Sequence, residues 1–254
     1  MNPTLRHFYE NHHGKVSDKW SIYLDEYQRL LHPLQDKEVC LLEVGVQNGG
    51  SLEIWGNYFS NARNIVGCDI DPKCAELSYT NSSIEIVIGD ICSPITTQAV
   101  LSTCNGPIDI VIDDGSHTSQ DIVTTFFNLF GHLKEGGIYI AEDLHCSYWP
   151  GFQGGLHHSH SSISFFKRLI DIVNFEHWEE DMTRCMYISE LVPINDTYEE
   201  LLSSIHSVEF INSLCIIKKR PYSENTLGHR IISGYDEIVQ QVKDKTGEIS
   251  KPQK

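Results

Sequence analysis

Short apolar runs alternate with stretches of helical spacing through the middle of the chain. The pattern predicts strands at 39–44, 64–69, 84–88, 108–113 and 137–141, separated by helices at 51–60, 73–79, 94–103 and 119–132. Strands and helices that alternate in this way form right-handed βαβ units, which give a parallel sheet covered by helices on both faces. A helix near 161–174 and two closing strands, 207–210 and 214–218, complete the pattern. We therefore expect an α/β fold with a doubly wound, mostly parallel sheet of seven strands that ends in a C-terminal antiparallel hairpin.

Polar segments flank this alternating region. We expect an N-terminal helical extension over 1–36, a main domain over 37–220 and a polar C-terminal tail over 221–254, with a short helix near 236–243. Apolar side chains in the extension recur with a helical period, at Trp20, Tyr23, Leu24, Tyr27, Leu30 and Leu31. Such a stripe is expected to pack on the sheet; a dimer contact and a cover over a substrate site are the alternatives.

Composition narrows the class of protein. The 254 residues suit one α/β domain with extensions, and the formal net charge of −16 argues against a nucleic-acid partner, which requires clustered Lys and Arg. The eight cysteines are scattered without a Cys-x-x-Cys pair, which is typical of reduced thiols. No apolar run is long enough to span a membrane, and the polar N-terminus is no signal peptide. We expect a cytoplasmic protein with no membrane partner.

A glycine turn follows the first strand and indicates a cofactor site. The strand ends near Glu43, and Gly45 and Gly49 precede a helix that begins at Ser51. Glycines let the backbone approach a ligand, and a helix N-terminus offers unpaired N–H groups. The spacing Glu-x-Gly-x-x-x-Gly differs from the Gly-x-Gly-x-x-Gly of dinucleotide dehydrogenases. An acidic strand end suits a cofactor with a cationic amino-acid part, as in S-adenosyl-L-methionine.

The next two strands also end in acidic residues. Asp69 lies where a carboxylate that binds ribose hydroxyls is expected, and Asp90 is placed to reach an adenine edge. Alone, each residue could equally cap a helix or form a turn. Acids at three successive strand ends favour a shared role in binding the cofactor.

Four carboxyl groups and an imidazole follow the fourth and fifth strands. The run at 113–117 is Asp-Asp-Gly-Ser-His, and Glu142 and Asp143 follow the fifth strand. So much negative charge is costly without a cation, and oxygen donors favour Mg²⁺, Mn²⁺ or Ca²⁺. Helix capping is the simpler alternative for these acids. His117 is placed to act as a base, although many such histidines only cap helices or face solvent.

Together with the runs Gly-Gly-Ile-Tyr-Ile-Ala-Glu-Asp at 136–143 and Ser-Tyr-Trp-Pro at 147–150, these motifs resemble the metal-dependent macrolide-sugar O-methyltransferases. The resemblance extends from about residue 17 to about residue 213. It implies a Rossmann-like class I methyltransferase fold, Mg²⁺ (or Mn²⁺) bound by Asp114, Glu142 and Asp143, and His117 as the general base. The expected cofactor-binding residues are Glu43, Gly45, Gly49, Ser51, Asp69, Asp90 and Asp113.

The predicted activity is methyl transfer from S-adenosyl-L-methionine to a sugar hydroxyl, with a glycosylated metabolite, a polysaccharide precursor or a nucleotide-linked sugar as the acceptor. A catechol-type O-methyltransferase, a non-catalytic cofactor-binding scaffold and a nicotinamide oxidoreductase are the alternatives. The resemblance also favours a homo-oligomer. The aromatic, glycine-rich loop at 148–160 is interpreted as a mobile cover over the acceptor. A second metal site at His157, His158 and His160 is less favoured, because exposed loop histidines usually bind nothing specific.

Overall fold

The sheet has seven strands, and its order places two strand ends at a crevice. The computed structural model describes residues 3–193, 195, 197–239 and 241–250. The strands are β1 (Cys40–Val44), β2 (Asn64–Asp69), β3 (Ile84–Ile88), β4 (Ile108–Asp113), β5 (Leu133–Ala141), β6 (Ile205–Ile211) and β7 (Leu214–Lys219). They lie in the order β3-β2-β1-β4-β5-β7-β6, with β1 to β5 parallel and β7 antiparallel to both its neighbours. The strand order reverses between β1 and β4, because β2 and β3 lie on one side of β1 and β4 and β5 lie on the other. Open α/β sheets bind ligands at such a point.

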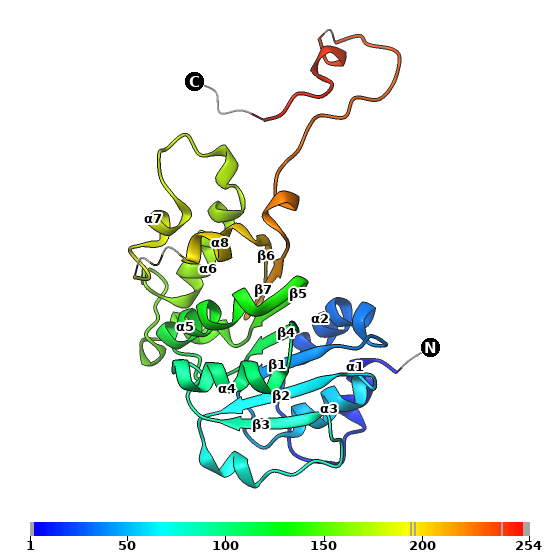
Figure 1. Cartoon of the computed structure of the whole chain (residues 1–254), viewed down its shortest axis with the longest axis vertical. Helices are drawn as coiled ribbons and strands as arrows, with labels where there is room; N and C mark the ends of the chain where they lie inside the picture. Colours follow the sequence, from blue (N-terminus) through cyan, green and yellow to red (C-terminus); the bar gives the residue numbers. More distant parts are fainter. Residues whose placement is uncertain (1–2, 194, 196, 240, 251–254) are drawn as a thin grey trace.

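Helices cover both faces of this sheet (Figure 1). They are α1 (Leu5–Glu10), α2 (Ser21–Leu31), α3 (Gly50–Tyr58), α4 (Pro94–Cys104), α5 (Ser119–Leu129), α6 (Ser162–Val173), α7 (Arg184–Ile188) and α8 (Thr197–Ser203). The first three lie on one face, and α4 to α6 lie on the other. The expected doubly wound sheet with its closing hairpin is confirmed.

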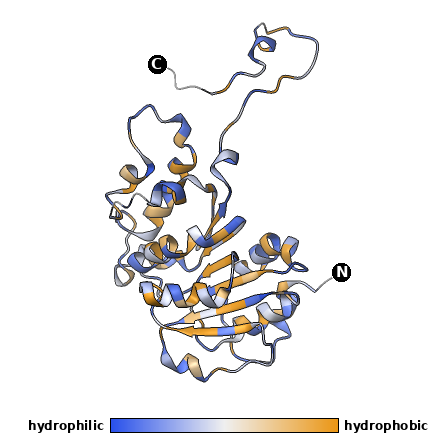
Figure 2. Ribbon diagram, in the orientation of Figure 1, coloured by the Kyte–Doolittle hydropathy of each residue, from blue (hydrophilic) through white to orange (hydrophobic). Residues whose placement is uncertain are grey.

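The two cores follow from the alternation of side chains along each strand. In β1, Leu41 packs into the core under α1 to α3, whereas Leu42 packs into the core on the side of α4 to α6. Both faces of the central strands are therefore apolar, as the orange strands of Figure 2 show.

The N-terminal extension contributes to the first core. Five members of the predicted stripe are buried there: Tyr23, Leu24, Tyr27, Leu30 and Leu31. The expectation that this stripe packs on the sheet is confirmed. Its inclusion of Trp20 is wrong, because Trp20 precedes the first turn of α2 and its side chain is 58% exposed.

Two predicted helices are absent from the described residues. Only the short 3-10 helix Pro72–Glu76 forms in the 73–79 region, and the chain is extended from Leu77. The polar run after it forms side-chain-to-backbone bonds instead, as Asn81 does with the N–H of Ser83. In the 236–243 region the described residues contain no α-helix; a 3-10 helix begins at Lys243. A short isolated helix there would lack tertiary packing.

The chain after β7 runs away from the sheet (orange to red in Figure 1). Its apolar side chains are exposed, with Tyr235 94% exposed and Ile238 97% exposed. Helices α7 and α8, which the sequence pattern did not predict, lie between α6 and the closing hairpin. Within the part of the chain that the structure describes, no helix has the length and apolar character needed to cross a bilayer.

Candidate active site

Two adjoining cavities lie at the carboxyl ends of β1, β2 and β4. The larger, of about 540 Å³, is lined by the segment 16–19, the glycine turn and the residues that follow β4. The smaller, of about 230 Å³, is lined by residues that follow β2, β3 and β4. Both share Gly45, Asp69 and Gly115. This continuous space at the β1/β4 crevice fits an extended nucleoside-containing cofactor.

The predicted cofactor residues divide between lining and supporting positions. Ser51 lines the larger cavity, and Asp90 and Asp113 line the smaller one. Glu43 and Gly49 line neither. Glu43 is buried and accepts a hydrogen bond of 2.7 Å from the hydroxyl of Ser51, so it stabilises the turn without lining either cavity.

Gly45 lets two strand ends approach each other closely. Its φ of +92° lies in the left-handed region, and a Cβ atom there would lie 2.1 Å from the backbone oxygen of Asp114. No side chain fits between these backbones, so the glycine is required by the contact between the turns that follow β1 and β4.

Asp69 holds the glycine turn through backbone N–H groups. Its Oδ2 accepts hydrogen bonds from Val46 (2.8 Å) and Gln47 (2.9 Å), and its Oδ1 accepts one from Asp71 (2.8 Å). Burial alone would raise the pKa of Asp69, but these donors outweigh it and hold the pKa below its ordinary value. Asp69 is therefore ionised at neutral pH. Its Oδ2 already accepts two of these hydrogen bonds, whereas Oδ1 accepts one and retains a lone pair for a ligand hydroxyl.

Asp113 lies beneath the smaller cavity. Tyr139 donates a hydrogen bond of 2.9 Å to its Oδ2. Burial is the largest influence on this carboxyl group and raises the pKa of Asp113 to about 7. It therefore differs from Asp69, although both residues end a strand at the same edge of the sheet.

A buried lysine joins the ends of three strands. The Lys19 side chain is 2% exposed; its ammonium donates hydrogen bonds to Asp114 and, at 2.7 Å, to Glu142, and lies 3.5 Å from Glu43. Tyr27 donates a further hydrogen bond of 2.5 Å to Glu142. Burial would lower the pKa of Lys19, but the three carboxyl groups raise it well above its ordinary value. Lys19 is therefore a fixed cation among these acids.

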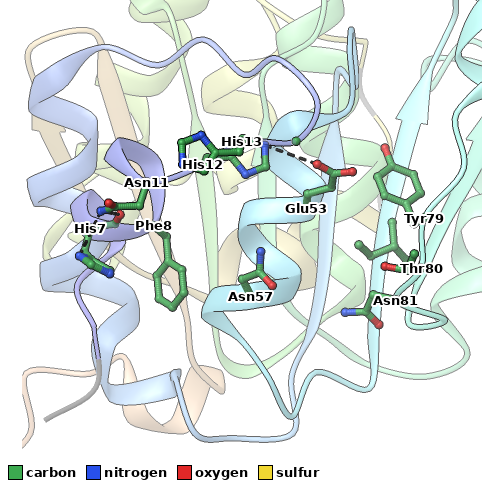
Figure 3. A pocket seen from close by; sticks show the side chains of 12 residues that line it. His7, Phe8, Asn11, His12, His13, Glu53, Asn57, Tyr79, Thr80 and Asn81 are labelled. Carbon is green, nitrogen blue, oxygen red and sulfur yellow. Dashed lines mark hydrogen bonds and ion pairs between the residues drawn. The ribbon is translucent and has the colours of Figure 1, made fainter.

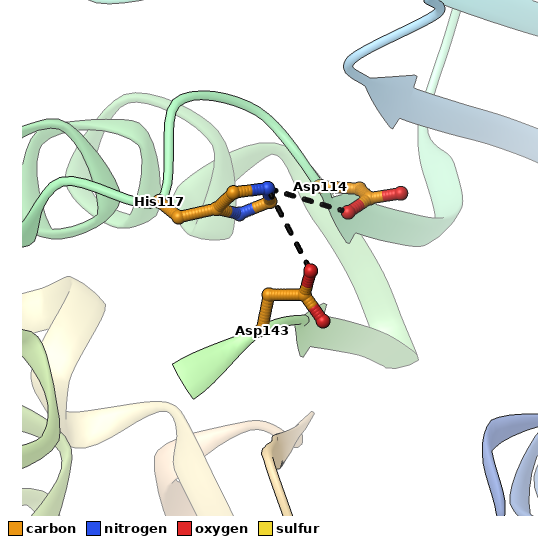
Figure 4. Close-up of side chains that lie close together, drawn as sticks. All are labelled: Asp114, His117 and Asp143. Carbon is orange, nitrogen blue, oxygen red and sulfur yellow. Dashed lines mark ion pairs between the residues drawn. The ribbon is translucent and has the colours of Figure 1, made fainter. Parts of the chain in front are cut away.

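Asp114, His117 and Asp143 form a more open group, called here the outer trio (Figure 4). The Nε2 atom of His117 lies 3.9 Å from Oδ1 of Asp114 and 3.8 Å from Oδ2 of Asp143. These spacings exceed hydrogen-bond lengths, and one donor atom from each residue lies within 4.8 Å of the other two. Two carboxylates and an imidazole at this spacing fit a hard divalent cation.

The ligand set that the resemblance implied is divided between two groups. Asp114 and Asp143 belong to the outer trio, whereas Glu142 converges with Glu43 and Asp114 around the ammonium of Lys19. Asp114 is common to both groups.

Asp143 and His117 adopt strained backbone conformations, which persist only where surrounding contacts stabilise them. Their φ angles are +54° and +57°, in the left-handed region that residues other than glycine rarely adopt. The carboxylate of Asp143 is fixed by hydrogen bonds from the indole N–H of Trp20 (3.0 Å) and the hydroxyl of Tyr23 (2.8 Å). These bonds leave its Oδ2 facing His117.

Sequence reasoning missed four residues of this site: Lys19, Trp20, Tyr23 and Tyr27. Two of them carried a usable signal. A buried stripe that contains tyrosines requires polar partners for their hydroxyls, and acidic strand ends supply them here. The histidines of the 148–160 loop belong to no group of converging metal ligands among the described residues. His12 lines a separate cavity beside Glu53 and Tyr79 (Figure 3).

Comparison with known proteins defines the class first. Residues 42–144 match the family model described as a methyltransferase domain. The solved MycE methyltransferase from the mycinamycin biosynthetic pathway, in complex with Mg, SAH and mycinamycin VI, aligns with a TM-score of 0.71 and 25% identity, over 87% of this chain and 55% of that one. Residues 42–144 are therefore similar to a methyltransferase domain, and the predicted class I methyltransferase fold is confirmed.

Curated relatives narrow the resemblance to enzymes that modify sugars. The 8-demethyl-8-α-L-rhamnosyl tetracenomycin-C 2'-O-methyltransferase of Streptomyces olivaceus is 40% identical over 63% of this chain and 43% of its own length. The mycinamicin VI 2''-O-methyltransferase of Micromonospora griseorubida is 33% identical over 64% of this chain and 42% of its own length. The predicted resemblance to macrolide-sugar O-methyltransferases is confirmed, and the chain spans about half the length of the curated relatives it matches.

Proposed function

We propose that this protein is a divalent-metal-assisted O-methyltransferase that uses S-adenosyl-L-methionine and acts on a sugar hydroxyl of a glycosylated metabolite. The observation that carries the proposal is the outer trio, which places an imidazole and two carboxylates at the edge of the larger cavity. Relatives whose names state a glycosylated acceptor support it. In this assignment Gly45, Asp69, Asp90 and Asp113 border the cofactor.

The outer trio divides the chemistry between binding and proton transfer. A divalent cation bound by Asp114 and Asp143 would lower the pKa of a coordinated sugar hydroxyl, which is a poor nucleophile at neutral pH. His117 would accept the hydroxyl proton at Nε2. The new oxygen–carbon bond forms as the sulfur–methyl bond breaks, and the sulfur keeps the electron pair to give S-adenosylhomocysteine. Alignment of the two reactants supplies much of the acceleration.

Lys19 would set the charge around this reaction. Because its ammonium already neutralises part of the charge of Glu43, Asp114 and Glu142, the site can hold four carboxyl groups near a cationic sulfonium. We expect Asp114 and Asp143 to be direct metal ligands, and Glu142 to act through Lys19 and Tyr27 unless the metal displaces the ammonium.

The test is a turnover assay with defined acceptors. Purified protein is supplied with S-adenosyl-L-methionine and Mg²⁺ and offered neutral glycosides, sugar nucleotides and catechol, and methylated products are identified by mass spectrometry. Methylation of a sugar hydroxyl that EDTA abolishes is the expected result. Methylation of catechol alone would favour the catechol-type alternative. This assay does not address the cytoplasmic location or the homo-oligomer, which stay predictions.

A further inference from the structure

Three aromatic rings lie in a row beside Asp143, on the outside of the cofactor cavities. The rings of Trp20 and His145 meet edge to face with centroids 5.8 Å apart, and His145 meets Trp149 in the same way at 5.0 Å. We call Trp20, His145 and Trp149 the aromatic platform. Trp20 is 58% exposed and Trp149 is 50% exposed, so a large apolar area faces solvent next to the outer trio.

Polar contacts hold the rings of Trp20 and His145, and the backbone of Trp149, although solvent reaches this surface. Trp20 is bonded to Oδ1 of Asp143 through its indole N–H, and His145 lies 2.6 Å through Nδ1 from the hydroxyl of Ser213. The backbone of Trp149 accepts a hydrogen bond from Gly154 (3.1 Å) and donates one to Cys146 (2.9 Å). Hydrogen bonds thus hold the rings of Trp20 and His145 and the backbone of Trp149, whose ring packs edge to face on His145. Ordered aromatic surfaces bind with little loss of conformational freedom.

Asp143 connects this surface to the reaction centre. One carboxylate oxygen accepts the indole N–H of Trp20, and the other lies 3.8 Å from Nε2 of His117. Neighbouring rings of the platform meet at 89° and 78°, so a ring-shaped ligand would pack against one exposed indole face, close to the side chains that contact Asp143. Indole faces pack well against the C–H groups of a sugar ring, while its hydroxyl groups remain free at the edge.

The charge of the surroundings selects a neutral ligand. The ring contacts, hydrogen bonds and ion pairs of the platform among the described residues involve no Lys or Arg. The lysine beside the outer trio, Lys19, is buried and already paired with carboxyl groups. The contacts of the platform therefore offer carboxylates to the phosphates of a sugar nucleotide, and the exposed lysine of the larger cavity, Lys73, belongs to the 3-10 helix that follows β2.

We propose that the aromatic platform is the acceptor subsite, and that it binds the apolar face of a sugar in an uncharged glycoside rather than in a sugar nucleotide. This inference rests on the proposed function and deepens it. The platform orients the sugar, and the outer trio acts on the hydroxyl at its edge. Trp149 binds the acceptor without touching the residues that hold metal or cofactor, so its contribution can be measured separately.

The experiment compares Trp149→Ala and Trp149→Phe with wild type. The acceptors are 8-demethyl-8-α-L-rhamnosyl tetracenomycin C as the neutral glycoside and thymidine-diphosphate-rhamnose as the charged counterpart. Trp149→Ala is expected to raise KM for a methylated glycoside about ten-fold, with Trp149→Phe between the two. The dissociation constant of S-adenosylhomocysteine, measured by calorimetry, should not change. Tyr235→Ala, which removes an exposed ring from the tail, is the matched control.

The outcomes separate this inference from the proposed function. If the wild-type protein methylates none of these acceptors, the proposed function fails and the inference fails with it. If a glycoside is methylated but Trp149→Ala leaves its KM unchanged, only the inference is overturned. Preference for the sugar nucleotide would also overturn it. So would a fall in molar mass of Trp149→Ala in light scattering, which would identify the platform as a contact between copies of the chain.

Discussion

The ammonium nitrogen of Lys19 lies 2.7 Å from Oε1 of Glu142, across 123 positions of sequence. Both side chains are buried, and the same ammonium is bonded to Asp114. The N-terminal segment thus supplies a positive charge that partly neutralises the acidic residues at this edge of the sheet. The site is therefore complete only when this segment is in place.

Loss of this charge should destabilise the fold. Lys19→Met leaves buried carboxyl groups unpaired and is expected to lower the free energy of unfolding by about 3–5 kcal/mol. Oxygen atoms of Glu43, Asp114 and Glu142 lie within 4.8 Å of one another, so Mg²⁺ should restore part of the loss. Thermal unfolding in EDTA and in Mg²⁺ measures both effects, with Lys37→Met, at an exposed lysine, as the control. Equal stability of Lys19→Met and wild type in EDTA would show that the ion pair contributes nothing.

The close approach at Gly45 predicts a severe effect of one methyl group. Gly45→Ala combines a strained φ with a Cβ placed 2.1 Å from the backbone of Asp114. Gly136 has a similar φ of +79° but open space around it, so Gly136→Ala should cost only about 1 kcal/mol. Urea unfolding of both variants, with calorimetry of S-adenosylhomocysteine, distinguishes strain from collision. Similar losses in the two variants would contradict the collision.

The sequence predicted the positions of β1 to β5 well because each strand is a short apolar run that local periodicity reveals. The acids at the strand ends were predicted for the same reason, since each follows an apolar run. Lys19 was missed because its partners come from three distant strand ends, and nothing in its neighbourhood indicates burial. Trp20 was placed in the core because helical spacing includes it, but the helix begins one residue later and the ring is directed to Asp143 instead.

The hydrogen bonds of Asp69 predict a pH-dependent contribution to stability. Its folded-state pKa lies below its ordinary value of about 3.9, so the stabilisation is fully present above that pH and is lost as the pH falls through the folded-state pKa. Asp69→Asn should lower stability by about 1 kcal/mol at pH 7, a value reduced for partial exposure. Urea unfolding at pH 7 and below pH 4 tests this, with Asp236→Asn in the exposed tail as the control. A constant difference across this range would refute the assignment.

The role of His117 predicts a loss of turnover without a loss of cofactor binding. His117→Ala is expected to reduce kcat by about 10²–10⁴-fold, which is typical when a general base is removed. Calorimetry should show unchanged affinity for S-adenosylhomocysteine. His157→Ala, in the 148–160 loop, should behave like wild type. Turnover of His117→Ala near the wild-type value would mean that another group accepts the proton.

The central claim is that one edge of the sheet binds both S-adenosyl-L-methionine and a divalent cation, and calorimetric titration tests it most directly. S-adenosylhomocysteine is titrated into EDTA-treated protein, and the titration is repeated with Mg²⁺ and with Asp114→Ala. We expect S-adenosylhomocysteine to bind in all three cases, with a separate Mg²⁺ heat that disappears in the variant. Absence of S-adenosylhomocysteine binding under every condition would contradict the methyltransferase assignment.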